Sequence, residues 1–242
     1  ADTDGHGGNT AVGYKAGYGL TTGTHNTLIG RQAGHAAMTA DYNVALGYLA
    51  MYGVTSAGEA TAVGYRAMVA NCTASGTTAL GSYALTNNTS GAGNTGVGCT
   101  ALISNVTGAN NVAVGHGACY ANTGSGQTAV GRSALAANTS GSDNTAMGHA
   151  ASIAVTTGVE NTTIGHDAGD VITTGSRNTI VGSGSDPSAA DGDDQMLFGR
   201  GLTGKGDDTF FCGGANGAYH YGNTTTWSTT SDRRIKKNIV DN

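Results

Sequence analysis

Two histidines, His149 and His166, lie seventeen residues apart, and each directly follows a glycine. Imidazole nitrogens bind several transition metals, so two of them on neighbouring turns of a repeat could hold an ion. Arg132 occupies the equivalent place one repeat earlier and brings a positive charge, and no column of carboxylates accompanies the histidines. We therefore predict no metal site and no cofactor, and interpret these residues as a ladder at the surface of the repeats or between subunits.

The same position after the glycine carries aromatic residues in other repeats. Stacked rings along a rod could contact glycans, and Tyr14, Tyr48 and Tyr65 are the candidate glycan contacts. The alternative is that the column is a structural ladder without a ligand. From the first repeat to the eleventh, the column reads Tyr14, Arg31, Tyr48, Tyr65, Ser82, Cys99, His116, Arg132, His149, His166 and Ser183.

These columns exist because the chain repeats itself. A glycine closes each motif of the type Asn-Thr-Ala-Val-Gly; ten of the eleven intervals between these glycines are 17 residues, and one, Gly115 to Gly131, is 16. A fixed short period is typical of a solenoid, and 17 residues suit one coil of a β-solenoid. The glycines are Gly13, Gly30, Gly47, Gly64, Gly81, Gly98, Gly115, Gly131, Gly148, Gly165, Gly182 and Gly199.

Each repeat predicts a short strand before its glycine. The residue next to the glycine is always apolar, and two residues earlier the chain has Thr nine times, Val twice and Met once. Residues two apart share a face of a strand, so we predict that both point into the coil. The mostly alanine column between them would then face outward, which predicts a subunit contact. Its alanines are Ala11, Ala45, Ala62, Ala79, Ala113, Ala129 and Ala146.

Two further columns predict how the coils stack. Asparagine recurs four residues before the glycine, and stacked side chains of this kind can hydrogen-bond from coil to coil. Alanine follows the glycine by three residues in ten of eleven coils, which predicts a tight interior corner. Leu28 stands where an outward alanine is expected, and this bulky residue needs room at the subunit contact.

Composition excludes several partners. Gly is 42 residues and only 11% of the chain is charged, whereas globular domains average about 7% Gly and 25% charged residues. The net charge of -5 provides no basic patch for nucleic acid, and no run approaches the roughly 18 apolar residues of a membrane span. The four cysteines form no CxxC pair, and we expect Cys99 and Cys119 to be buried free thiols.

The string NTAVGYKAGYGLTTG resembles the NTAVGYxAL…NTTG repeats of phage tail-fibre proteins. It is also similar, more loosely, to the head repeats of trimeric autotransporter adhesins. The resemblance covers about residues 9–199. It implies an all-β fold, a parallel β-solenoid (β-roll) of 17-residue coils that is homotrimeric.

Residues 231–239, SDRRIKKNI, look like the opening of the intramolecular chaperone auto-processing domain that ends phage tail spikes and endosialidases. The resemblance implies that Ser231 is the nucleophile and Lys236 its base, and that the Thr230–Ser231 bond is cleaved. A desolvated lysine can activate a serine hydroxyl in this way. The family's domain is far longer than the stretch up to Asn242, so we expect the chain as given to be inert.

We therefore expect a β-solenoid over residues 1–199, a short β-rich C-terminal cap or neck over 200–230, and the start of a chaperone domain over 231–242. The expected function is a structural and attachment protein, a trimeric rod segment of a phage tail fibre or tail spike. It would be extracellular, part of the virion, and would bind a glycan or protein receptor on the host surface. The alternative is a bacterial trimeric surface adhesin or extracellular filament subunit.

Two other classes are disfavoured. A glycan-degrading enzyme needs a cleft with paired carboxylates, and the repeats hold few acids, with Asp191, Asp193 and Asp194 together on what reads as a terminal loop. An ice-binding solenoid needs a flat exposed array of threonines. The threonine column here exchanges with Val and Met, and its predicted inward orientation argues against that function.

Overall fold

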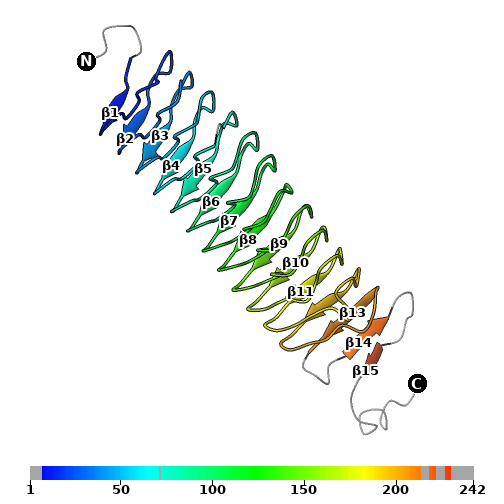
Figure 1. Ribbon diagram of the computed structural model, residues 1–242. Helices are drawn as coiled ribbons and strands as arrows, with labels where there is room; N and C mark the ends of the chain where they lie inside the picture. Colours follow the sequence, from blue (N-terminus) through cyan, green and yellow to red (C-terminus); the bar gives the residue numbers. More distant parts are fainter. Residues whose placement is uncertain (1–6, 71, 214–217, 222–226, 230–242) are drawn as a thin grey trace, which may run out of the picture.

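The computed structural model describes residues 7–70, 72–213, 218–221 and 227–229. These residues form an all-β rod, a parallel β-solenoid of about 12 turns with coils of about 17 residues (Figure 1). The predicted fold class is confirmed to this extent. Each coil contributes one short strand to a single long sheet, and turns form the rest of the coil.

The strands are three residues long through most of the rod and stack in sequence order. Their bounds are β1 (Thr10–Val12), β2 (Thr27–Ile29), β3 (Val44–Leu46), β4 (Thr61–Val63), β5 (Thr78–Leu80), β6 (Thr95–Val97), β7 (Val112–Val114), β8 (Thr128–Val130), β9 (Thr145–Met147), β10 (Thr162–Ile164), β11 (Thr179–Val181), β12 (Met196–Phe198), β13 (Thr209–Cys212), β14 (Ala218–Tyr221) and β15 (Trp227–Thr229).

The register keeps equivalent residues in line from coil to coil. Val12 pairs with Ile29, and across the one 16-residue interval Val114 still pairs with Val130, so the missing residue is lost from a turn and not from the strand. The glycine after each strand is required by this stacking. Gly81 has φ 139°, and a Cβ on it would lie 2.5 Å from the carbonyl oxygen of Gly98 in the next coil.

The predicted asparagine ladder is confirmed and runs inside the coils. The Oδ1 of Asn26 accepts a hydrogen bond of 2.9 Å from the backbone N–H of Asn43, and the Nδ2 of Asn26 donates to the Ala40 carbonyl at 3.0 Å. The same arrangement recurs where Asn161 Oδ1 accepts from the Asn178 N–H. Both partners are buried, so the ladder satisfies backbone groups that water cannot reach.

The predicted interior corner is also confirmed. The alanines three residues after the glycine are fully buried from the second coil to the tenth. They are Ala33, Ala50, Ala67, Ala84, Ala101, Ala118, Ala134, Ala151 and Ala168.

Parallel pairing continues past the last periodic glycine, Gly199. Strand β13 pairs in parallel with β12, aligning Phe198 with Cys212, and β14 and β15 extend the sheet in antiparallel order. These strands lie in the range 200–230 that the sequence predicts to be β-rich. The role of that range as a neck stays a prediction.

Candidate functional site

The most extensive candidate site is the outer face of the sheet. The side chains on this face are not the alanines that the sequence analysis expected there. In each strand from β2 to β12 the middle residue points into the coil and its two neighbours point out. The middle side chains Ala45, Ala62 and Ala79 have no exposed surface, while Leu46 and Leu80 on the same strands are 44% and 45% exposed. The predicted orientation of the strand was therefore wrong.

This finding also corrects the predicted subunit contact. Ala45, Ala62, Ala79, Ala113, Ala129 and Ala146 are fully buried within their own chain, so they cannot touch another one. Ala11 is exposed because it lies in the first strand, but its register with the buried Leu28 gives it the same inward direction.

The alanines are small because the coil interior is narrow, and a large side chain enters it from the opposite wall. At Gly96, which takes the alanine's place in β6, a Cβ would lie 3.3 Å from Leu85 Cδ1. Leucine or methionine fills this opposite place, four residues after the glycine, in most central coils. The buried residues of this kind are Met51, Met68, Leu85, Leu102 and Leu135.

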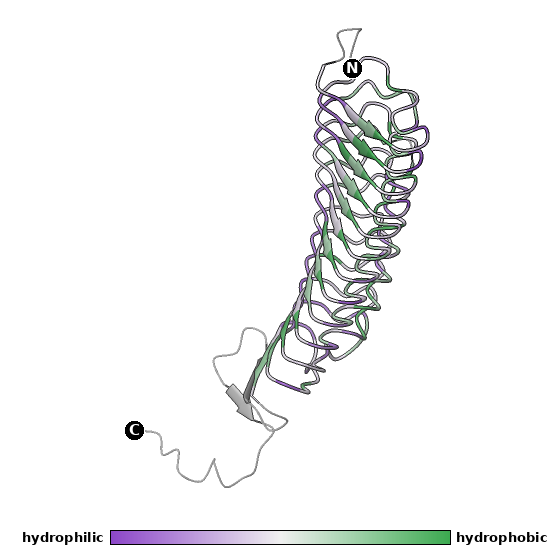
Figure 2. Ribbon diagram, turned by 90° about the vertical axis from the view of Figure 1, so that its left-hand side faces the viewer, coloured by the Kyte–Doolittle hydropathy of each residue, from purple (hydrophilic) through white to green (hydrophobic). Residues whose placement is uncertain are grey.

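The outward column next to the glycine is apolar along the whole rod and runs beside the mostly threonine column; together we call the two columns the outer stripe. Figure 2 shows the strands as a continuous ladder of mostly hydrophobic colour from one end of the solenoid to the other. Between the apolar residues the outward threonines are half-buried from the second coil to the eleventh. The exposed apolar side chains of the stripe are Val12, Val44, Leu46, Leu80, Val112, Val114, Met147, Ile164, Met196 and Phe198.

The candidate glycan-binding tyrosines lie together at the edge of the first coils. The Arg31 guanidinium lies 5.7 Å from the Tyr14 ring centroid and 5.5 Å from that of Tyr48, and Tyr48 stacks on Tyr65 with centroids 5.5 Å apart. Tyr65 meets Tyr83 edge-on. Tyr48 thus lies between Arg31 and Tyr65, so a sugar would reach mainly its edge and hydroxyl group, whereas Tyr14 is 62% exposed.

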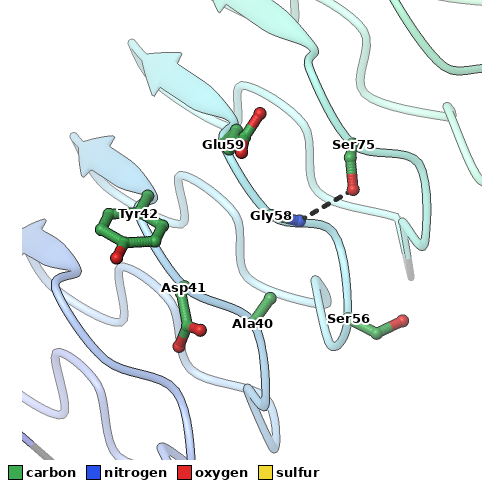
Figure 3. Close-up of a pocket in the computed structure, with 7 residues that line it drawn as sticks. All are labelled: Ala40, Asp41, Tyr42, Ser56, Gly58, Glu59 and Ser75. Carbon is green, nitrogen blue, oxygen red and sulfur yellow. Dashed lines mark hydrogen bonds between the residues drawn. The ribbon is translucent and has the colours of Figure 1, made fainter.

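A shallow polar pocket lies between coils three and five, beside β3 and β4 (Figure 3). The Asp41 carboxylate accepts hydrogen bonds from the N–H and hydroxyl of Thr24 at 2.6 and 3.0 Å, and these bonds lower its pKa. Asp41 is thus held as a hydrogen-bond acceptor and is unsuited to general-acid chemistry. The pocket is lined by Ala40, Asp41, Tyr42, Ser56, Gly58, Glu59 and Ser75.

The two histidines of the ladder lie beside a carboxylate that the column pattern did not reveal. The rings of His149 and His166 stack with centroids 5.0 Å apart and planes 13° from parallel. Asp167 places Oδ2 2.9 Å from His166 Nδ1 and Oδ1 3.8 Å from His149 Nδ1. A search for carboxylates one position beside the histidine column would have found Asp167.

The terminal acidic residues have structural partners. Asp194 forms a two-pronged ion pair with Arg177, at 2.8 and 2.7 Å, and this pairing lowers the pKa of Asp194. Asp193 accepts a hydrogen bond of 2.7 Å from the Ser176 N–H. These partners link adjacent coils, and Asp191 is exposed.

All four cysteines are free thiols. Cys119 is buried as predicted, whereas Cys99 is exposed, because it stands in the outward column after the glycine. The prediction of a buried Cys99 was wrong. The implied cleavage residues Thr230, Ser231 and Lys236 lie outside the described residues.

Across the part of the chain that the structure describes, no helix has the length and apolarity needed to cross a membrane. No protein family, curated protein or solved structure matches this chain.

Proposed function

We propose that the chain is a structural rod that associates side by side with copies of itself, as a segment of a phage tail fibre or tail spike that attaches to a host surface. The observation that carries this proposal is the outer stripe. A soluble monomer rarely exposes a contiguous apolar patch of more than a few hundred Å² unless the patch binds something.

The dimensions of the stripe favour a partner of the same shape. Strands about 4.8 Å apart place the twelve periodic strands over a length on the order of 50 Å. A second rod with the same repeat matches this length and spacing coil for coil. Ten exposed apolar side chains, each gaining roughly half of the 1.5–3 kcal/mol of full burial, give on the order of 10 kcal/mol per chain. That gain is comparable with the cost of bringing chains together.

A homotrimer is the specific assembly that we propose. Closed symmetry with its axis along the rods brings the same face of every chain to the centre and buries every stripe. The number three rests on the resemblance to trimeric fibre repeats. In such an assembly the Tyr14, Tyr48 and Tyr65 edges are the proposed glycan contacts, and a protein receptor is the alternative ligand.

Because threonines point outward from the sheet, ice binding has to be weighed against self-association as the function of this face. That function needs a regular flat array, whereas here Val44, Val112 and Met196 interrupt the column. The adjacent outward column varies in size from valine to Phe198, which suits interdigitation with another protein. Self-association is therefore favoured, and a thermal-hysteresis measurement on the purified chain separates the two functions.

The sharpest test compares two pairs of equally exposed residues. Leu80→Lys with Val114→Lys places charges on the outer stripe, at side chains 45% and 36% exposed. Val106→Lys with Val171→Lys, at 40% and 43%, places the same charges on turns outside the strands. Light scattering after size exclusion gives the mass of each variant, to be compared with 23.8 kDa for one chain.

We expect the wild type and the turn variant to have three times the chain mass, and the stripe variant to be a monomer with an unchanged circular dichroism spectrum. A monomeric wild type at every concentration, or a stripe variant that still associates, would contradict the proposal. An assembly of two chains would keep the interface and reject the trimer.

Processing at the Thr230–Ser231 bond by Ser231 and Lys236 also belongs to the proposal and rests on the resemblance alone. Mass spectrometry of the full-length gene product and its Ser231→Ala variant tests it. Cleavage in the former and not in the latter supports it, and equal uncleaved masses reject it.

A further inference from the structure

We propose that His149, His166 and Asp167 bind one divalent transition-metal ion, with Zn²⁺ as the representative ion, and that this ion links two adjacent coils. The proposal revises the prediction of no metal site and is independent of the proposed function. Its basis is that the chain places two imidazoles and one carboxylate with ligand atoms all within 4.8 Å of one another.

Binding an ion requires a rearrangement of the three side chains but not of the backbone. Zinc bonds of about 2.0–2.2 Å in a tetrahedral site hold ligand atoms roughly 3.3 Å apart, so the widest separation has to close by about 1.5 Å. The side chains of His149, His166 and Asp167 are 46%, 61% and 37% exposed. Rotations of these side chains can provide that movement, and an ion can enter directly from solvent.

The backbone holds the three ligands together across the coil boundary. The N–H of Asp167 donates a hydrogen bond of 3.0 Å to the carbonyl of His149, which fixes the carboxylate beside the histidine of the preceding coil. Asp167 also has a left-handed backbone conformation, φ 54°. Both Nδ1 atoms lie beside the same carboxylate, at 3.8 Å for His149 and 2.9 Å for His166. Because the two rings are nearly parallel, they have to rotate out of their stack to direct both lone pairs at one ion.

The sequence at this place differs from every other coil. Asp167 is the only acid two residues after the periodic glycine, and its column neighbours Ala150 and Gly184 are small. The carboxylate therefore has room beside the two imidazoles. Arg132, whose charge opposes a cation, lies on the side of His149 away from His166 in the column order.

The donor set identifies the class of ion. Two imidazole nitrogens and one carboxylate oxygen suit Zn²⁺, Co²⁺, Ni²⁺ or Cu²⁺, whereas Ca²⁺ and Mg²⁺ prefer oxygen ligands throughout. Three protein ligands leave at least one coordination position for water or for a group from another molecule.

Isothermal titration of the whole chain with ZnCl₂ tests the proposal. We expect saturable binding of one ion per chain, and affinity at least about tenfold lower in each of His149→Ala, His166→Ala and Asp167→Asn. His35→Ala is the matched control, because the His35 ring also stacks between side chains of neighbouring coils, Tyr18 and Tyr52. This control should bind like the wild type.

A second readout separates lost binding from lost folding. Zn²⁺ should raise the melting temperature of the wild type and of His35→Ala, but not of the three ligand variants, whose spectra without metal should match the wild type. No saturable binding in the wild type would overturn the proposal. Unchanged affinity in the three ligand variants would overturn it as well, because the ions would then bind at other histidines.

Discussion

Leu28 and Gly34 face each other across the interior of the second coil, and the large side chain of Leu28 occupies the space left by the missing side chain of Gly34. A Cβ on Gly34 would lie 2.8 Å from Leu28 Cδ2, and one on Gly17 would lie 3.1 Å from Leu28 Cδ1. Leu28 thus fills the space that a leucine or methionine four residues after the glycine fills in the central coils. Its size is accommodated inside the coil, and no room at a subunit contact is needed.

The first prediction follows from this exchange of volumes. Leu28→Ala should destabilise the rod by about 2–5 kcal/mol through a cavity, and Gly34→Ala by about 1–3 kcal/mol through overpacking. The double variant Leu28→Ala/Gly34→Leu recreates the central pattern, in which Leu85 holds φ 50° where Gly34 has 56°. Urea unfolding at fixed protein concentration should show it to be more stable than Leu28→Ala alone. The single variant Gly34→Leu completes the cycle. A double variant whose loss equals the sum of the losses of Leu28→Ala and Gly34→Leu would show that the two sites are not coupled.

The same exchange shows what the sequence could and could not predict. The period, the register, the asparagine ladder and the alanine corner follow from single columns, because each column has one residue type with one physical role. Which face of the strand points into the coil does not follow from single columns. Apolar residues flank a small apolar residue in each strand, so both faces have the composition of a buried face. The deciding signal links two columns: Ala62 goes with Met68, Ala79 with Leu85, and Leu28 with Gly34.

The cluster of His149, His166 and Asp167 shows a different limit of prediction from sequence. His149 and His166 are visible as a column, but Asp167 belongs to the next column and converges on them only through a left-handed backbone residue. Equivalent residues of successive coils share a column, whereas the contact of Asp167 with the two histidines joins neighbouring columns. The sequence can thus name Asp167 as a candidate neighbour, whereas its contact with both histidines follows from the fold.

The second prediction concerns the asparagine ladder. Asn144 Oδ1 accepts from the N–H of Asn161 at 3.0 Å, and its Nδ2 donates to the Gly158 carbonyl at 2.9 Å. Asn144→Ala leaves both groups buried without these partners and should cost about 1–3 kcal/mol per unsatisfied group. Asn144→Gln is the control, since Gln127 occupies the same column and donates to the Gly141 carbonyl. Urea unfolding should rank the wild type above Gln and Gln above Ala; equal stability of Ala and the wild type would contradict the role of the ladder.

The third prediction concerns thiol reactivity. Burial raises the pKa of Cys119 to about 12 and also raises that of Cys72, so both stay protonated and shielded near neutral pH. Cys99 is exposed. Iodoacetamide at pH 8 should therefore modify Cys99 in the folded chain and reach Cys72 and Cys119 only after unfolding, since the thiolate is the nucleophile. Peptide mass mapping before and after urea checks this, and Cys99→Ser provides the control. Labelling of Cys119 in the folded chain would contradict its buried position.

The fourth prediction concerns a carboxyl group that favours its neutral form. Burial, and next the charge of Asp170, raise the pKa of Asp186 to about 6. A raised folded-state pKa gives stability that is fully present below the unfolded value near 3.9 and is lost as the pH rises through 6. Asp186→Asn keeps an oxygen that can accept the N–H of Val171, now 3.4 Å from Asp186 Oδ1, and carries no charge.

The Asp186→Asn variant should therefore match the wild type near pH 4 and exceed it at pH 7 and above. Because the group is partly exposed, the gain is on the order of 1 kcal/mol, less than the full pKa shift implies. Urea unfolding at pH 4, 5, 6, 7 and 8 measures it, and Asp191→Asn, at an exposed aspartate nearby, removes the same charge from the chain. If Asp191→Asn stabilises the rod equally at pH 7, the effect comes from net charge. If the stability of Asp186→Asn relative to the wild type does not rise between pH 4 and 7, Asp186 ionises without cost in the folded rod, and the prediction is wrong.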